Sequence, residues 1–398
     1  AAGQSVYHFG FGQAPFPVPE RLQEELARHA YAQDYMPSAG YQPLREAATA
    51  YHCTKAGLNP DEWLTLVGPG SKILLFALQM AIEGDVLLPI PSWVSYHPQA
   101  RLLKQNVIKV PATFKNGYII EPETLQAAIT QARHEGLNPT KIILNSPNNP
   151  TGLKIPVFNL RQIAAVCEQN DITILSDEIY ALVDFDEEYT SIAQYAPQRT
   201  CITTGLSKHL SLGGWRVGIT LIPKHLSTLI AAVEAIASEL WSAAPSPIQK
   251  ACVSAYSGHP DIEAHITTCT RAHSTVMGWM AKELNQAGLY TPAPQGAFYL
   301  FPDFSGHKSV LKGHQVHKAA ALSAWLLNAH NIASLPSTSF GMDDNALYLR
   351  LSGTDYDGAA VLDHIKTKGI DTPETFVQHA APSVYQGIRT LAEIFKEC

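Results

Sequence analysis

The sequence predicts an α/β fold in which a mostly parallel sheet is flanked by helices and a smaller α+β domain is attached. Two observations lead to this prediction. Short apolar runs rich in β-branched residues alternate with helical patterns through the middle of the 398-residue chain, which is typical of a parallel sheet covered by helices on both faces. From about residue 286 the pattern changes to the runs AFYLFPDF (297–304) and NALYLRLS (345–352), with a helix expected over 315–330 between them.

The length of the chain favours two domains. We expect a large domain over 37–285 and a small domain formed by 1–36 together with 286–398. Strands are expected near 64–67, 85–89, 106–110, 141–145, 172–176, 200–204 and 217–221. Helical patterns lie between them, for example SKILLFALQMAIE (71–83) and VFNLRQIAAVCEQN (157–170).

Composition argues against several classes of protein. A net charge of −7 does not suggest a nucleic-acid partner, because such proteins normally present a basic face. No apolar run approaches the roughly 18–20 residues that span a bilayer, and no signal-peptide pattern opens the sequence. Six cysteines without a C-x-x-C pair suit a reducing cytosol. We therefore expect a cytoplasmic protein with neither a nucleic-acid nor a membrane partner.

No metal site is expected. His134-Glu135 begins an H-E-x-x-H pattern, but Asn138 stands where the second histidine belongs. A helical pair of histidines at that spacing is what zinc binding requires.

Polar residues follow four of the predicted strands. They are Gly70-Ser71-Lys72 after 64–67, Asn149 after 141–145, Asp177 after 172–176 and Lys208 after 200–204. Ligands of open α/β sheets bind beyond the carboxyl ends of the strands. These residues are therefore expected to converge on one site.

The residue types in this set match the chemical groups of one cofactor. A lysine in an enclosed pocket can form a Schiff base with an aldehyde, and a strand-end aspartate such as Asp177 can hold a protonated ring nitrogen. A helix that opens at Ser71 offers N–H groups to a phosphate, to which Ser207 and Arg216 add a hydroxyl and a guanidinium. An aldehyde, a pyridinium nitrogen and a phosphate together describe pyridoxal 5′-phosphate.

The chain also resembles a known family, the class I/II aminotransferases of the pyridoxal-phosphate-dependent transferases of fold type I. The resemblance covers almost the whole chain and rests on seven segments in the family's order. They are GFGQAPFPVPE (10–20), DYMPSAGYQPLREA (34–47), PSWVSY (91–96), NSPNNPTG (145–152), SDEIY (176–180), SKHLSLGGWRVG (207–218) and LPSTSFG…LYLRLS (335–352).

The resemblance implies a role for individual residues. Lys208 is implied as the Schiff-base lysine, Asp177 as the partner of the pyridine nitrogen, and Asn149 and Tyr180 as partners of the cofactor's phenolic oxygen. Trp93 would stack on the cofactor ring, Arg216 would bind its phosphate, and Tyr35 would reach the phosphate of a neighbouring subunit in a homodimer. Gly12 would line the substrate carboxylate, which Arg350 would bind.

Each of these residues also has a purely structural interpretation. Asp177 is a common type of helix N-cap, Asn149 before Pro150 is a common turn former, and Trp93 suits a hydrophobic core. Arg350, in an otherwise apolar run, would then form a salt bridge with a protein carboxylate.

The chain departs from the family pattern in two places. Gly205 stands where the family often has a serine, three residues before the lysine. In ASELWSAAPSP (237–247), Ser238 falls where one dicarboxylate-specific branch has arginine, and no Lys or Arg occurs over 225–249. The absence of that arginine favours neutral, aromatic or unusual amino acids over dicarboxylates.

The implied function is transfer of an amino group between an L-amino acid and a 2-oxo acid. A lyase, replacement or cyclase reaction of an amino acid would use the same motif residues, so the sequence leaves that alternative open. A ligand-sensing regulator on this fold would carry an added basic DNA-binding segment, whereas the motifs here begin by residue 10.

Overall fold

A seven-stranded sheet forms the centre of the larger part of the molecule in this computed structural model, which describes residues 5–396. The strands lie in the order β2-β8-β7-β6-β5-β3-β4. β8 runs antiparallel to its neighbours β2 and β7, and the other neighbouring pairs are parallel. Their bounds are β2 (Trp63–Gly68), β3 (Asp85–Ile90), β4 (Val107–Pro111), β5 (Pro139–Asn145), β6 (Thr173–Asp177), β7 (Thr200–Gly205) and β8 (Gly218–Pro223).

All seven strands expected from the sequence are confirmed, with bounds that differ by at most two residues. They could be recognised because the sheet is covered on both faces, so its strands are apolar almost throughout. On β3, Val86 and Leu88 pack on the side of α3 (Ser71–Ala81) and α7 (Ser227–Leu240). Leu87 packs on the opposite side, with α5 (Pro122–His134) and α6 (Val157–Gln169).

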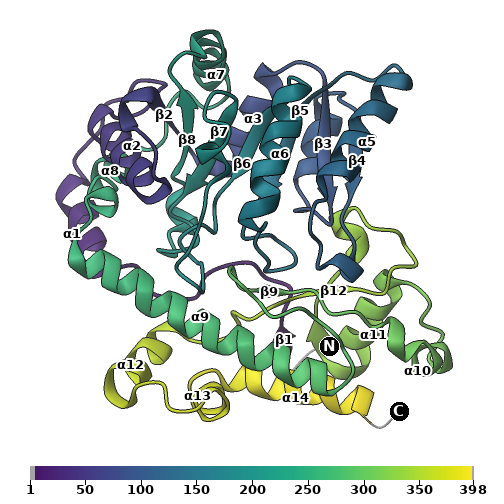
Figure 1. Cartoon of the computed structure of the whole chain (residues 1–398). Coiled ribbons are helices and arrows are strands. Elements are labelled where there is room, and N and C mark those ends of the chain that lie inside the picture. Colours follow the sequence, from purple (N-terminus) through teal and green to yellow (C-terminus); the bar gives the residue numbers. More distant parts are fainter. Residues whose placement is uncertain (1–4, 397–398) are drawn as a thin grey trace.

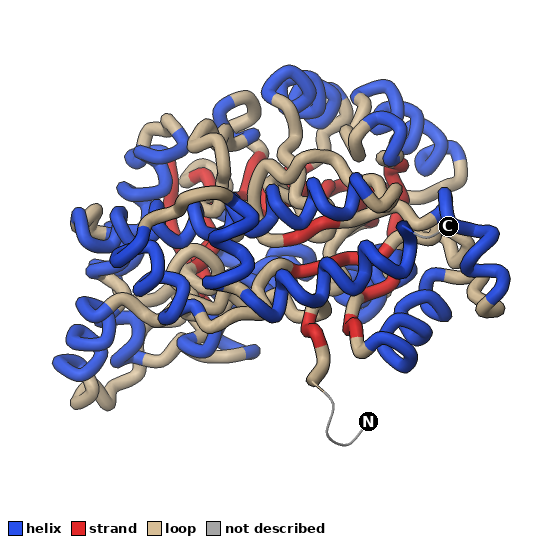
Figure 2. The backbone as a smooth tube through the Cα atoms, turned by 90° about the horizontal axis from the view of Figure 1, so that it is seen from below, coloured by secondary structure: helices blue, strands red, loops and turns tan. Residues whose placement is uncertain are grey.

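The smaller part of the molecule lies below this sheet (Figure 1). It contains the sheet β11 (Leu335–Pro336), β12 (Leu349–Ser352) and β9 (Tyr299–Leu300), and a pair formed by β1 (Tyr7–His8) and β10 (Ile332–Ala333). Its helices are α10 (Lys308–Gly313), α11 (Ala319–His330), α12 (Gly358–Lys368), α13 (Pro373–Ala380) and α14 (Pro382–Lys396). Seen from below, helices and loops lie in front of much of the central sheet (Figure 2).

Four further helices connect or cover the two parts. They are α1 (Glu20–His29), α2 (Gln42–Ala56), α4 (Tyr96–Leu102) and α8 (Ser246–Ala251). α1 packs against α8 on the side of the large sheet, whereas the preceding strand β1 pairs with β10 of the small part. The long helix α9 (Pro260–Gln286) packs against α13 and α14. The division at residues 36 and 286 stays a proposal, because both α1 and α9 link the two parts.

The helix expected over 315–330 begins at Ala319 instead. Gln315 has a left-handed backbone, with φ of 60°, and Lys318 is extended, with φ of −134°. Neither conformation belongs to an α-helix. The residues before Ala319 therefore form the link from α10 to α11.

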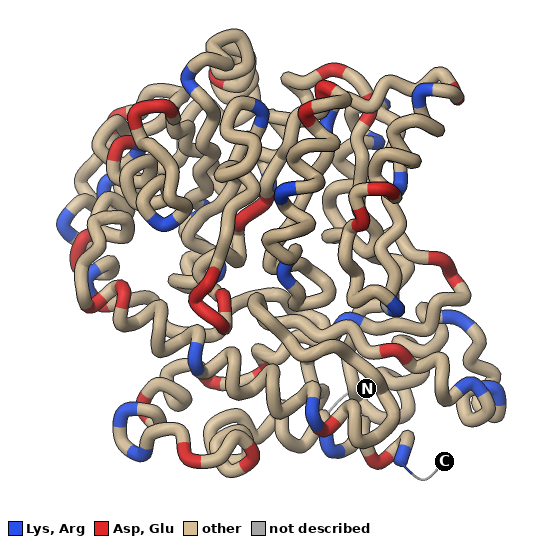
Figure 3. Tube along the Cα trace, viewed as in Figure 1, with Lys and Arg blue, Asp and Glu red and all other residues tan. Residues whose placement is uncertain are grey.

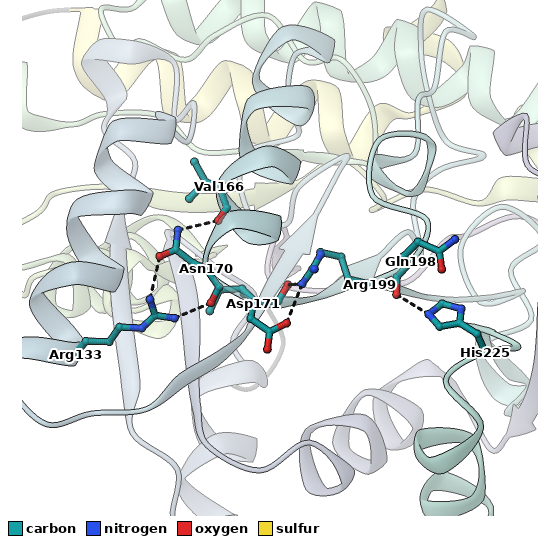
Figure 4. A network of polar contacts seen from close by, with 8 residues as sticks. Arg133, Val166, Asn170, Asp171, Gln198, Arg199 and His225 are labelled. Carbon is teal, nitrogen blue, oxygen red and sulfur yellow. Dashed lines mark hydrogen bonds and ion pairs between the residues drawn. The ribbon is translucent and has the colours of Figure 1, made fainter.

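Polar side chains connect the loops that precede β6 and β7, at the amino ends of these strands (Figure 4). Arg133 donates to the backbone oxygen of Asn170 at 2.6 Å and to its Oδ1 at 3.0 Å. Arg199 pairs with Asp171 at 3.4 Å, and His225 contacts the Gln198 carbonyl at 3.1 Å. These contacts connect loops of the scaffold, at the opposite edge from the predicted site.

Lysine and arginine alternate with aspartate and glutamate along both parts of the molecule (Figure 3). None of the helices described for residues 5–396 combines the length and apolar character that crossing a membrane requires. Within the same residues, no three His, Cys, Asp or Glu side chains are arranged to hold a metal ion. Cys398 lies outside the described residues, and the other five cysteines are buried and free.

Candidate active site

Lys208 lies in the loop between β7 and β8, at the end of the sheet that faces the small part. The side chain is half-buried, and its Nζ donates to the backbone oxygen of Gly12 at 2.5 Å. The ring centres of Tyr180 and Phe298 are each 5.6 Å from the same nitrogen. The amine therefore lies where the large sheet, the N-terminal segment and the small part meet.

Asp177 is the last residue of β6 and is only 3% exposed. Its Oδ2 accepts a hydrogen bond from the Tyr96 hydroxyl at 2.6 Å, and its Oδ1 accepts one from the Ile179 N–H at 3.3 Å. Burial raises the pKa of Asp177 to about 6, while both hydrogen bonds and the charge of Lys208 act in the opposite direction. The Ile179 contact is a local turn and not a helix cap, because no helix begins directly after Asp177, and it occupies only one oxygen.

Arg350 on β12 is a buried guanidinium without a carboxylate partner. The residue is 4% exposed, and it forms no ion pair with any aspartate or glutamate in the described part of the chain. Its Nη1 donates to Asn149 Oδ1 at 3.2 Å and its Nη2 to the Gly10 carbonyl at 2.6 Å, while Nε has no hydrogen-bond partner. The salt-bridge interpretation is therefore wrong, and a buried cation in this state favours an anionic ligand.

The N-terminus of α3 forms a third corner of the site with Arg216. Gly70 precedes the helix with φ of 100°, and a Cβ there would collide with Arg216 Nη2. A Cβ at Gly218 would collide with the backbone of Gly70 and Ser71. Since free N–H groups at a helix start and a guanidinium both bind phosphate, this tightly packed corner suits a phosphate.

Trp93 and Lys72 lie beside the same corner. Lys72 Nζ is 5.0 Å from the Trp93 ring centre, and Trp93 meets Tyr96 edge to face at 5.3 Å. Trp93 also packs on the hydrophobic cluster around α3 and β3. Trp93 is only partly buried, so it packs on this cluster and still leaves part of its surface exposed.

The predicted residues thus fall into three connected groups. One group holds Lys208, Asp177, Tyr180 and Gly12, a second holds Arg350 and Asn149, and a third holds Gly70, Ser71, Lys72, Trp93 and Arg216. Ser207, next to Lys208, is half-buried. Tyr35 is not brought to these groups, because its side chain is 93% exposed.

The structure explains one departure from the expected motif. A Cβ at Gly205 would lie 2.8 Å from the Val217 carbonyl and 3.1 Å from the Gly218 Cα. Both contacts are tighter than side chains normally tolerate, so the close approach of β7 and β8 leaves no room for a serine.

Sequence reasoning missed two tyrosines. Tyr96, which hydrogen bonds to Asp177, follows β3 and could have been found by the strand-end rule that located the others. Tyr299 lies under Arg350, with 4.5 Å between the guanidinium carbon and the ring centre. Its run AFYLFPDF looks like an ordinary buried strand and carried no signal.

A lysine and a buried carboxylate at the carboxyl rim of a sheet with this topology are the groups that a pyridoxal-phosphate enzyme of the α/β class requires. The family model described as "Aminotransferase class I and II" matches residues 3–364. The chain belongs to this family, it is an aminotransferase, and it uses pyridoxal 5′-phosphate.

Curated relatives and solved structures agree with this assignment. The chain is 32% identical over 364 residues to a "Probable aspartate/prephenate aminotransferase" of Aquifex aeolicus, covering 88% of this chain and 87% of the relative. It is 31% identical over 354 residues to an aspartate aminotransferase of Geobacillus stearothermophilus, covering 87% and 86%. The aspartate aminotransferase of Thermus thermophilus with maleate superposes with a TM-score of 0.82 at 26% identity, covering 98% of this chain and 92% of that one.

The residues of the site fit this cofactor. Asp177 offers a buried carboxylate for the ring nitrogen, and the Gly70–Arg216 corner has the compactness that a phosphate needs. Thr203, paired with Asp177 across β6 and β7, is fully buried, and its Oγ1 has no hydrogen-bond partner among the described residues. Such an orphaned hydroxyl beside Asp177 is understandable next to a bound polar ligand.

Replacing Gly70 with alanine should weaken cofactor binding. The new Cβ would push Arg216 aside and strain a backbone with φ of 100°, so we expect the dissociation constant for pyridoxal 5′-phosphate to rise at least about tenfold. Fluorescence titration of the cofactor-free protein measures it. Gly278→Ala is the control, because a Cβ at that position on α9 meets nothing within 4 Å. Equal affinities for the two variants would contradict the assigned corner.

Replacing Asp177 with asparagine should stabilise the cofactor-free protein at neutral pH. The folded state holds the Asp177 proton up to a pKa of about 6, whereas the unfolded chain releases it near its ordinary value of about 4. The folded state therefore binds more protons between these values, and stability falls as the pH rises through this window. Asparagine removes this penalty, so we expect a gain of up to about 3 kcal/mol at pH 7.5.

Urea unfolding of both cofactor-free proteins at pH 7.5 and pH 5 measures this effect. The gain should be smaller at pH 5, where folded Asp177 is mostly protonated. Asp371→Asn, at an exposed position, serves as the control and should show no pH-dependent gain. An equal gain at both pH values would show that the charge of Asp177 is not its cause.

Proposed function

We propose that Lys208, Asp177 and Arg350 carry out the amino-group transfer of this aminotransferase, between an L-amino acid and a 2-oxo acid. The observation that carries this proposal is that the Lys208 amine and the Asp177 carboxylate, which carry opposite charges, lie near the guanidinium of Arg350, which can bind a carboxylate. Lys208 acts electrostatically on Asp177, and the backbone oxygens of Gly12 and Gly10 connect Lys208 with Arg350.

When bound, pyridoxal 5′-phosphate supplies an aldehyde that takes up an amino group and a protonated ring that withdraws electrons. Lys208 would hold the cofactor through that aldehyde and, once released, move the proton at the substrate's α-carbon. Asp177 would keep the ring nitrogen protonated. Binding of that cation would also lower the pKa of Asp177, which burial raises to about 6 against the opposing effects of its hydrogen bonds and of Lys208.

The remaining groups bind and orient. Ser71, Ser207 and Arg216 would bind the phosphate, with Gly70 allowing Arg216 its close approach. Asn149 and Tyr180 would contact the phenolic oxygen. Trp93 would cover the ring, with Lys72 beside it.

Arg350 would bind the substrate carboxylate at the opposite end of the site. Its unpartnered Nε and the weak 3.2 Å bond to Asn149 leave donors for two carboxylate oxygens. Gly12 would line the same carboxylate. A substrate fixed in this way presents its α-carbon to Lys208, and such orientation is worth several kcal/mol in a reaction barrier.

The preferred amino donor is a neutral or aromatic amino acid in this proposal. The relatives above are named for aspartate and prephenate. This chain has no Lys or Arg over 225–249, and aromatic rings surround Arg350, with Phe340 at 5.5 Å and Tyr299 at 4.5 Å. An apolar lining favours apolar side chains over a second carboxylate.

A second copy of the chain would complete the phosphate corner. Tyr35 is 93% exposed, and a groove of about 360 Å³ opens beside Arg216 and Lys72, lined also by Phe76 and Leu102. An aromatic residue with a hydroxyl suits a groove that is apolar with a basic end. We therefore propose a homodimer in which each Tyr35 reaches the phosphate of the partner subunit.

The proposed compartment is the cytoplasm. Five of the cysteines are buried thiols with no disulfide among residues 5–396. Free thiols are the usual state in a reducing compartment.

Replacing Lys208 with alanine should abolish both the covalent attachment of the cofactor and the amino transfer.

The test of the transfer incubates the wild-type holoenzyme with a panel of single amino acids, including phenylalanine, leucine, aspartate and glutamate, without an oxo-acid acceptor. We expect conversion of the bound cofactor to its amine form and release of a 2-oxo acid, fastest with the neutral or aromatic donors. Absorbance spectra and mass analysis of the products measure this.

Lys366→Ala is the control for loss of a lysine, because Lys366 is exposed on α12, away from the site, and it should keep the transfer. Release of ammonia or a cyclic product in place of the amine cofactor would favour an elimination or ring-closing enzyme. Full turnover by Lys208→Ala would refute the role of Lys208.

Mixing two defective variants should restore activity if Tyr35 serves the partner subunit. A hybrid of Tyr35→Ala and Lys208→Ala chains has one site with both residues intact only when Tyr35 crosses between subunits. We expect the mixture to regain up to about a quarter of wild-type activity after subunit exchange, since random pairing makes half of the dimers hybrid. No gain after demonstrated exchange would contradict the crossing.

A further inference from the structure

We propose that Tyr299 is a positioning residue of the active site, whose ring supports Arg350 in binding the substrate carboxylate and whose hydroxyl holds Tyr180. This inference rests on the roles of Arg350 and Tyr180 proposed above. It extends them to a residue that no motif in the sequence marks.

The ring of Tyr299 lies directly against the guanidinium. β9 and β12 are antiparallel with Tyr299 opposite Ser352, so Arg350, two residues along β12, points to the same side of the sheet. The distance from the guanidinium carbon to the ring centre is 4.5 Å, and Tyr299 is 1% exposed. A desolvated cation over an aromatic face is stabilised, which partly offsets burial of Arg350 without using its donors.

The ring contact occupies none of the N–H donors of Arg350, so those that Asn149 and Gly10 do not engage remain for the substrate. A protein carboxylate in the same place would neutralise the guanidinium and compete for its N–H groups. The ring attracts the cation and accepts none of the in-plane hydrogen bonds. Tyr299 therefore holds a buried arginine in place while Nε stays without a partner.

The hydroxyl of Tyr299 contacts a second functional group. It is 2.8 Å from the Tyr180 hydroxyl, with the two rings edge to face at 5.7 Å. If Tyr180 donates to the cofactor's phenolic oxygen, its own oxygen is left as the acceptor for Tyr299. Burial raises the pKa of Tyr180, so Tyr180 keeps the proton that this chain of hydroxyls requires.

Two glycines show that Tyr299 is fitted closely between the motif segments. A Cβ at Gly12 would collide with the Tyr299 hydroxyl, and a Cβ at Gly152 would collide with its backbone oxygen. Gly12 also accepts from Lys208, and Gly152 ends the segment that carries Asn149. Tyr299 thus contacts both segments and sets how close they lie to Arg350.

Two substitutions separate the ring from the hydroxyl. Tyr299→Met removes the aromatic face and fills similar space with a flexible side chain, whereas Tyr299→Phe removes only the hydroxyl. Tyr290→Met is the control, because Tyr290 lies in the same part of the molecule and is 60% exposed. Thermal unfolding of each holoenzyme shows whether it is folded.

The first readout is binding of carboxylates that carry no amino group. Acetate and 3-phenylpropionate are titrated against each holoenzyme and followed by the cofactor's absorbance. We expect Tyr299→Met to weaken binding, and to raise the KM for amino acids, by about tenfold with kcat changed less than about threefold. Tyr299→Phe should bind within about twofold of wild type. Wild-type affinity in folded Tyr299→Met, or no carboxylate binding by wild type, would overturn the proposal.

The second readout is the pH titration of the cofactor's absorbance. Tyr299→Phe should shift the midpoint of this titration by at least about half a pH unit, because Tyr180 loses its hydrogen bond. A midpoint identical to that of wild type would overturn the proposal, and this arm remains decisive if Tyr299→Met does not fold.

The experiments distinguish failure of the proposed function from failure of the role proposed for Tyr299. If wild type transfers no amino group but the carboxylate and pH patterns appear as expected, the proposed function is wrong and the role of Tyr299 stands. If transfer occurs and neither variant differs from Tyr290→Met, only the role of Tyr299 is wrong.

Discussion

The site depends on keeping a carboxylate and a guanidinium charged where water has been removed. An isolated buried charge is expensive, and the usual response is a shifted pKa or a partner. Asp177 is supported by the Tyr96 hydroxyl, the Ile179 N–H and the charge of Lys208. Arg350 is supported by two oxygen acceptors and an aromatic face. Neither has a full counter-charge in the protein, so both are prepared for a charged ligand, the one for a protonated ring and the other for a carboxylate.

Holding these two charged groups ready for a ligand requires segments that are far apart in the chain to meet within a few ångströms. The N-terminal segment contributes two carbonyls, of Gly10 and Gly12, to cations from β12 and from the β7–β8 loop. Glycines make these approaches possible. Gly12 and Gly152 admit Tyr299, while Gly70 and Gly218 allow Arg216 and the start of α3 to come together. A side chain at any of these positions would separate groups that must act on one ligand, which is a stronger requirement than backbone freedom alone.

Much of the fold and part of the site were predictable from sequence. The seven strands of the large sheet carry continuous apolar runs because helices cover both faces, and continuous runs are visible without knowing the fold. Asp177 and Lys208 were found because the carboxyl ends of parallel strands share one edge. The start of α11 was placed too early, since the residue with the left-handed backbone is Gln315, and glutamine is not a residue type that predicts such a turn. Tyr96 was overlooked although it follows β3, and Tyr299 was invisible because a buried aromatic residue in a short strand is ordinary.

The amino-acid sequence by itself determined which chemical groups are available and the order in which the scaffold presents them, because strand periodicity and strand-end position are local properties. Tertiary structure alone decided which of these groups touch. From the sequence alone, Arg350 could have paired with a carboxylate, and nothing explained why position 205 lacks the serine of the family pattern. The packing of distant segments decides both points. The reason is physical: contact distance and desolvation depend on how separate segments pack, and no local pattern of residues encodes either quantity.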